Sequence, residues 1–97
     1  MAIVVIQEFS SASLEQYNDV TERLNLGGNS PAGNLFHAAG IADGGLRVVE
    51  VWESEHAFHS FLGTLGPITQ QMGIAPPVVK VFPVHNILTP ASYNIPF

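Results

Sequence analysis

The sequence predicts one α+β domain whose elements follow in the order strand, helix, strand, strand, helix, strand. Its 97 residues are 46% hydrophobic and only 11% charged, which suits a single folded core and excludes a disordered chain. Two segments carry apolar residues at helical spacing, and four others are rich in apolar and β-branched residues. An Asp-Gly-Gly sequence at 43–45 separates the two middle strands and favours a tight reversal of the chain.

The first strand is expected at residues 3–9, where apolar and β-branched side chains stand at successive positions. Such a run is typical of a strand that is buried on both faces. A helix follows, because Ser13 and Gln16 have the spacing of a capping box and apolar residues then recur at helical spacing. Tyr17 belongs to the stripe that faces the core, and the helix is expected to end at Gly27-Gly28.

The middle of the chain predicts a β-hairpin. Residues 27–34 form a loop by composition, and strands are expected at 35–41 and 46–52. Either Asp43-Gly44 or Gly44-Gly45 supplies the positive φ that a tight turn needs.

A second helix and a last strand complete the domain. Ser54 is the expected N-cap, and the helix has an unusually aromatic core stripe, made of Phe58, Phe61, Leu62 and Leu65. Pro67 predicts a bend or a restart, because proline in a helix interior loses a hydrogen bond and clashes with the preceding turn. The last strand is expected at 78–88, with Pro83 as a bulge or edge feature, and residues 89–97 form a tail.

This order is the ferredoxin-like βαββαβ arrangement, a four-stranded antiparallel sheet with both helices on one face. The other face is left bare although its strands carry apolar residues. We therefore expect that face to pack against a second copy, which gives a homodimer, a dimeric α+β barrel.

Charge and composition exclude several classes of partner. Three basic residues stand against eight acidic ones, so the chain offers no basic surface for nucleic acid or an anionic membrane. It has no cysteine and no phosphate-binding glycine motif, and we expect no organic cofactor. The N-terminal apolar run is too short for a signal peptide, which favours a cytoplasmic protein.

The chain resembles the dimeric α+β barrel superfamily in three respects: the order of its elements, its length, and the stretch from Arg47 through Trp52-Glu53-Ser54 to Phe58. Within it the chain is similar to the antibiotic biosynthesis monooxygenase-like proteins, and the resemblance covers residues 2–88. It implies a small-molecule enzyme with a cavity between sheet and helices. Other members of the family are cyclases, isomerases and haem-degrading enzymes.

The family's cofactor-free quinone-forming oxygenases carry a Trp at this strand end and an Asn four residues earlier, on the same face of the strand. Trp52 matches the first position, whereas Val48 occupies the second. Valine can neither hydrogen-bond a phenol nor stabilise its oxyanion. The departure puts the oxygenase activity in doubt for this chain.

His37 and Glu50 are the candidate catalytic residues. A hairpin loop with an even number of residues places His37 opposite Glu50 or Trp52, and all three side chains then share one face. A carboxylate beside an imidazole fixes its tautomer, as needed to remove a proton from a phenol or from carbon next to a carbonyl. The alternative is a polar couple paired for structural reasons in the dimer interface, and an odd loop would change the partners altogether.

Aromatic side chains are expected to line the space between helices and sheet, as in pockets for flat apolar ligands: Phe36, Trp52, Phe58, Phe61 and Phe82. An ordinary core has the same composition. Tyr17 is expected either to lend its hydroxyl to a substrate or to be a core aromatic with one hydrogen bond. His85 either points into the cavity or is a strand-end histidine satisfied by backbone.

His56 and His59 stand three apart on the second helix but lack a third ligand nearby, so we expect no metal. The sequence thus favours a cofactor-independent enzyme that acts on an aromatic or polyketide-like small molecule by acid-base chemistry. It would be an isomerase, a cyclase or a monooxygenase. The alternative is a non-enzymatic dimeric barrel that binds a hydrophobic metabolite or has a purely structural role.

Overall fold

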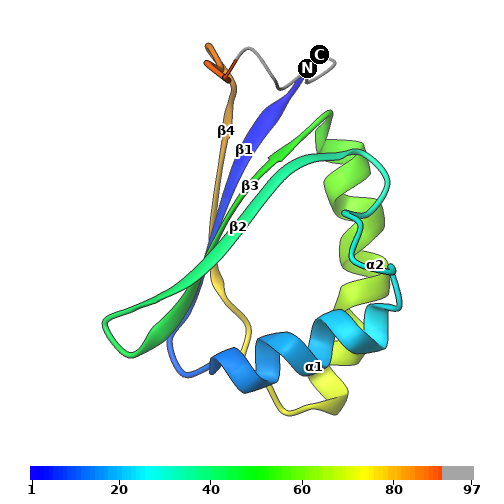
Figure 1. Cartoon of the computed structure of the whole chain (residues 1–97), viewed down its shortest axis with the longest axis vertical. Helices are drawn as coiled ribbons and strands as arrows, with labels where there is room; N and C mark the ends of the chain where they lie inside the picture. Colours follow the sequence, from blue (N-terminus) through cyan, green and yellow to red (C-terminus); the bar gives the residue numbers. More distant parts are fainter. Residues whose placement is uncertain (91–97) are drawn as a thin grey trace.

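A computed structural model describes residues 1–90, and its elements follow the predicted order (Figure 1). Four antiparallel strands form one sheet in the order β2-β3-β1-β4: β1 (Ile3–Phe9), β2 (Asn34–Ala42), β3 (Gly45–Trp52) and β4 (Val78–Pro83). Helices α1 (Leu14–Leu24) and α2 (Glu55–Gln71) lie on the same side of that sheet. The predicted fold class is confirmed, while most of the tail expected at 89–97 lies outside the described residues.

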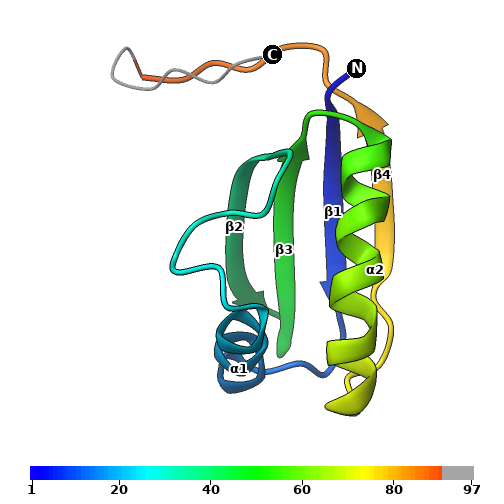
Figure 2. The ribbon, with the colours of Figure 1, turned by 90° about the vertical axis from the view of Figure 1, so that its right-hand side faces the viewer.

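The core lies between the helices and the inner face of the sheet. Along β1, buried residues alternate with half-buried ones, so the strand is covered fully on one face only. One buried cluster joins Ile3 and Val5 to Trp52 and Phe58, and a second joins Phe9, Ala12, Leu46 and Val48. In the view of Figure 2, α2 runs in front of β1 and β4, and its Phe58 and Phe61 side chains pack against Trp52 at the end of β3. No helix among residues 1–90 is long and apolar enough to cross a membrane.

Helix α1 begins as the sequence predicts and ends a little earlier. The backbone N–H of Gln16 donates to Ser13 Oγ, and the Gln16 side chain accepts from the Ser13 N–H, which completes the capping box. The helix ends because Asn25 adopts the left-handed conformation, with φ of 55°, before Gly27 is reached.

The hairpin turn decides which residues share a face. Ala42 pairs with Gly45, so the loop is the two-residue Asp43-Gly44, and both residues have positive φ, 51° and 76°. Positive φ at both central residues is typical of a type I′ turn, whose twist matches that of the flanking strands. The resulting register places His37 directly opposite Glu50, as one of the two predicted turns requires.

Helix α2 is continuous over 17 residues and contains Pro67, so the restart expected at this proline is wrong. Proline clashes with the Cβ of the preceding residue, but that residue is Gly66. The carbonyl that loses its hydrogen-bond donor belongs to Gly63, which also lacks a side chain, and all three residues face solvent. Gly66 thus spares the proline ring a contact with a preceding Cβ, and the freed carbonyl of Gly63 lies where water can satisfy it.

The last strand is shorter than the predicted 78–88, because β4 is an edge strand whose neighbour β1 begins at Ile3, opposite Pro83. One further bond, from the Val84 N–H to the Ala2 carbonyl, closes the ladder.

The outer face of the sheet carries neither helix (Figure 1) and is rich in apolar residues. Strand parity assigns to it the exposed side chains Phe36, Val49, Val78 and Phe82, together with the half-buried Val4, Ile6 and Val51. On the same face Glu8 pairs with Arg47 and Lys80, at 3.7 and 3.4 Å.

Candidate functional site

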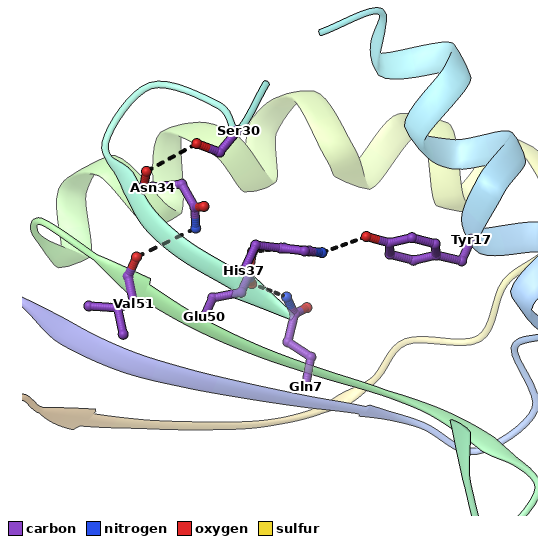
Figure 3. A network of polar contacts seen from close by, with 7 residues as sticks. All are labelled: Gln7, Tyr17, Ser30, Asn34, His37, Glu50 and Val51. Atoms are coloured by element: carbon purple, nitrogen blue, oxygen red, sulfur yellow. Dashed lines mark hydrogen bonds and ion pairs between the residues drawn. The ribbon is translucent and has the colours of Figure 1, made fainter. Parts of the chain in front are cut away.

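Four side chains form a continuous chain of hydrogen bonds on the inner side of the sheet (Figure 3). The Tyr17 hydroxyl lies 2.6 Å from His37 Nε2, and His37 Nδ1 lies 3.0 Å from Glu50 Oε2. The Gln7 amide nitrogen donates to Glu50 Oε1 at 2.9 Å. The chain thus runs from α1 through three adjacent strands, β2, β3 and β1.

The strand register brings these residues together. Glu50 stands opposite His37 on β2 and opposite Val5 on β1, and Gln7 follows Val5 on the same face of β1. Tyr17 extends from α1 toward the imidazole of His37 (Figure 3). The sequence prediction that His37 and Glu50 are neighbours on one face is confirmed.

The hydrogen bonds assign the protons in the chain. Glu50 is almost completely buried, and its carboxylate can only accept, so His37 Nδ1 donates to it. In a neutral imidazole Nε2 is then the acceptor, and the Tyr17 hydroxyl donates to it. The carboxylate therefore holds His37 in the tautomer of a base whose acceptor nitrogen faces Tyr17.

The environment keeps Tyr17 in its neutral form. Burial raises the pKa of the Tyr17 hydroxyl above its ordinary value, and the nearby negative charge of Glu50 raises it further. The tyrosine and imidazole rings are nearly parallel, at 26°, and meet end to end through the hydroxyl, with centroids 5.9 Å apart. Tyr17 is thus a protonated phenol that is held in place by its hydroxyl.

Two cavities adjoin along this chain. A small cavity of about 80 Å³ reaches between the sheet and the helices, and its walls are mostly apolar. A larger opening of about 670 Å³ lies beside it, bounded also by the loop between α1 and β2. Both are lined by Tyr17, Thr21, Leu24, His37, Glu50 and Phe61. A ligand in either cavity can therefore reach the hydrogen-bonded chain.

The predicted aromatic lining is only partly present. Phe61 lines both cavities. Phe36 borders the larger one at the edge strand, but its side chain lies on the outer face of the sheet, not between sheet and helices. Trp52 and Phe58 are fully buried and pack on each other with ring centroids 5.7 Å apart, and neither is among the residues lining these two cavities. They form the core that supports the site.

The expectation that Phe82 lines the space between sheet and helices is wrong. Phe82 pairs with Val4 and shares its face of the sheet, the face away from the helices, because β4 joins the edge of β1 in that register. His85 follows the end of β4, where it is exposed and lines neither cavity.

The sequence analysis missed three polar residues of the site, Gln7, Ser30 and Asn34. Gln7 is buried and holds Glu50, and a signal for it existed, since it is the one polar residue among the inward positions of β1. Ser30 Oγ donates to the Asn34 carbonyl at 3.3 Å, and both residues line the larger cavity. Within residues 1–90, the buried Asn34 Oδ1 finds no hydrogen-bond donor.

Val48 lies on the same strand face as Trp52, as the resemblance implies, and forms part of the apolar wall of the small cavity. Its buried neighbours are Phe9, Ala12 and Leu46. The wall thus offers no polar group where the quinone-forming oxygenases have an amide.

Histidines 56 and 59 are both exposed on α2, and the ring of His59 lies tilted beside that of Phe58, with centroids 5.7 Å apart. Over the part of the chain that the structure describes, residues able to bind a metal do not gather in groups of three or more.

The fold matches several solved structures along nearly their whole length. A candidate antibiotic biosynthesis monooxygenase from Chloroflexus aurantiacus has 15% identity and a TM-score of 0.64, over 92% of this chain and 98% of that one. SnoaB from Streptomyces nogalater, described as a cofactor-independent oxygenase, has 15% identity and a TM-score of 0.65, over 90% and 96%. MupZ from Pseudomonas fluorescens has 11% identity and a TM-score of 0.68, over 96% and 98%.

At this level of identity the matches establish a common fold. The resemblance to antibiotic biosynthesis monooxygenase-like proteins is confirmed in that sense. No family model and no curated protein matches the sequence.

Proposed function

We propose that the protein is a small enzyme, independent of organic cofactors, that acts on an aromatic or polyketide-like molecule by acid-base chemistry. The observation that carries the proposal is the hydrogen-bonded pair of the buried Glu50 and the partly exposed His37 beside two adjoining cavities. A buried carboxylate paired with a histidine at a cavity is typical of sites where protons move during a reaction. The reaction class is proton transfer, as in an isomerase, a cyclase or the first step of a monooxygenase.

In this proposal His37 is the general base and Glu50 orients it. The carboxylate stabilises the imidazolium that forms when His37 takes a proton, and a second hydrogen bond from Gln7 keeps the carboxylate in position. The mostly apolar small cavity suits a flat hydrophobic part of the substrate.

The neighbours in fold support a reaction on a small molecule, since SnoaB is described as an oxygenase that needs no cofactor. Val48 favours proton transfer over oxygenation in this chain, because its side chain cannot hydrogen-bond a substrate oxygen at that position of the wall.

A panel of phenols, quinones and lactones tests the proposal by thermal shift and by turnover, followed by chromatography and oxygen consumption. We expect at least one class to raise the melting temperature and to be converted. His37→Ala should abolish conversion and keep the fold, whereas His59→Ala on the exposed face of α2 should change neither.

Conversion that His37→Ala leaves intact would contradict the proposal. Stabilisation by a ligand without conversion would instead favour the alternative, a non-enzymatic barrel that binds a hydrophobic metabolite.

We further propose that the working protein is a homodimer joined through the outer face of the sheet. The exposed apolar side chains of that face, Phe36, Val49, Val78 and Phe82, support this pairing, because a contiguous apolar surface is typical of an interface.

A further inference from the structure

We infer that Tyr17 is the catalytic residue that exchanges protons with the substrate, and that it relays them to His37. The substrate class is then a phenol or a ketone with an acidic C–H next to its carbonyl. The inference rests on the proposed function and deepens it, since it names the group that touches the substrate and the chemistry that the substrate must have.

The first step of the argument is that His37 has no acceptor left for a substrate. Its Nδ1 is held by Glu50 at 3.0 Å, and its Nε2 is held by the Tyr17 hydroxyl at 2.6 Å. A base whose acceptor nitrogen is already occupied can take a substrate proton only through the group that occupies it.

The second step is that Tyr17 is the accessible end of the chain. The other end is closed, because Gln7 and His37 satisfy the two oxygens of the buried Glu50. The Tyr17 side chain lines both cavities, and after donating to His37 its oxygen still has lone pairs that can accept from a ligand. A phenol kept neutral by burial has the proton that a relay must pass on.

The proton transfers balance without a further reactant. The substrate's C–H or O–H bond breaks, its proton goes to the Tyr17 oxygen, and the electron pair stays on the substrate as an enolate or phenolate. The hydroxyl proton of Tyr17 moves at the same time to His37 Nε2, which becomes an imidazolium paired with Glu50. Tyr17 is neutral before and after, and the reverse transfer returns a proton to another atom of the substrate.

The test is the exchange of the α-hydrogens of 2-tetralone, a bicyclic aromatic ketone, for deuterium from heavy water, followed by proton NMR. We compare the wild-type protein with Tyr17→Phe, His37→Ala and the double variant, and we use His59→Ala as the matched control. The wild-type protein should accelerate exchange over buffer, and His59→Ala should match it. Tyr17→Phe and His37→Ala should each lower the rate on the order of 10²-fold or more, and the double variant should be no slower than either single one.

If Tyr17→Phe does not lower the exchange rate, the inference is overturned, and the proposed function still stands. If Tyr17 only occupies the base, its removal frees His37 Nε2, and the rate should then equal or exceed that of the wild-type protein. No acceleration by the wild-type protein would overturn the inference and would also count against the proposed function.

A second measurement tests the relay even if Tyr17→Phe is less stable than the wild-type protein. In a Tyr93→Phe background, 3-fluorotyrosine labels Tyr17 alone and lowers the pKa of the phenol without changing its shape. A relay requires the protonated phenol, so the alkaline limb of the rate profile should move to lower pH. An unchanged profile would overturn the relay, because a purely structural tyrosine would leave the profile in place.

Discussion

Gln7 on β1 and Glu50 on β3 are 43 residues apart in the chain, and the amide of Gln7 donates a 2.9 Å hydrogen bond to the carboxylate. Both side chains are buried, with exposed fractions of 4% and 1%. The bond holds Glu50 from the side opposite to His37, so the carboxylate cannot turn away from the imidazole. The site therefore depends on a residue that touches neither the base nor the phenol.

Replacing Gln7 by Leu should destabilise the fold, because it leaves Glu50 Oε1 buried without a donor. The expected loss is about 1 to 3 kcal/mol in the free energy of unfolding, measured by urea denaturation. Gln70→Leu, on the exposed side of α2, is the matched control and should change little. Equal stability of Gln7→Leu and the wild-type protein would show that the carboxylate does not need this donor.

The hydroxyl of Tyr17 should titrate above its ordinary pKa of 10.0, because burial and then the charge of Glu50 both raise the pKa. Glu50→Gln removes the charge and should lower the pKa of Tyr17, but not below the ordinary value, since burial is the larger cause. Ultraviolet titration of the phenolate measures both values after subtraction of the Tyr17→Phe signal. A rise in the Tyr17 pKa in Glu50→Gln would contradict this assignment.

The same shift has a consequence for alkaline stability. The folded state binds the Tyr17 proton more tightly than the unfolded state, so this contribution to stability is fully present below the unfolded pKa. It is lost as the pH rises through the folded pKa. The Tyr17→Phe variant should therefore lose less stability than the wild-type protein in this alkaline range.

Val48→Asn should not be a neutral change. It places an amide among Phe9, Ala12 and Leu46, and an unpaired buried amide costs about 1 to 3 kcal/mol. Thermal unfolding measures the loss, with Val81→Asn on the exposed edge strand as control. Full tolerance of Val48→Asn, together with faster oxygen consumption on phenols, would mean that the site is a degraded oxygenase site and that the roles of His37 and Glu50 are wrong.

The protein should sediment as a dimer of about 21 kDa, twice the 10.4 kDa of the chain. Phe82→Glu places a charge on the apolar outer face and should shift the equilibrium toward the monomer. Leu14→Glu, at an exposed position of α1, should leave the dimer intact. A monomer at all concentrations in analytical ultracentrifugation would contradict the pairing.

Local turn chemistry made half of the site predictable from the sequence. Asp43-Gly44 sets the register of the hairpin, and that register alone places His37 opposite Glu50. The contact between Tyr17 and His37 depends instead on the position of α1 relative to β2, which no local pattern encodes. The face of Phe82 was mispredicted for a similar reason, since it follows from long-range pairing of β4 with β1.

The restart expected at Pro67 does not occur, and α2 runs through the proline. The residue before it is Gly66, so no Cβ lies against the proline ring, and Gly63, whose carbonyl loses its donor, is exposed to water.

Because of the order of strands in the sheet, the residues of the site lie on strands that differ in local stability. β3 and β1, which carry Glu50 and Gln7, each have two neighbouring strands, whereas β2, which carries His37, is an edge strand held by β3 alone. Edge elements with exposed backbone fray at lower free energy than central ones. Amide hydrogens of β2 should thus exchange with solvent sooner than those of β1 and β3, and transient fraying of β2 would release the base from Tyr17 while its carboxylate partner stays fixed.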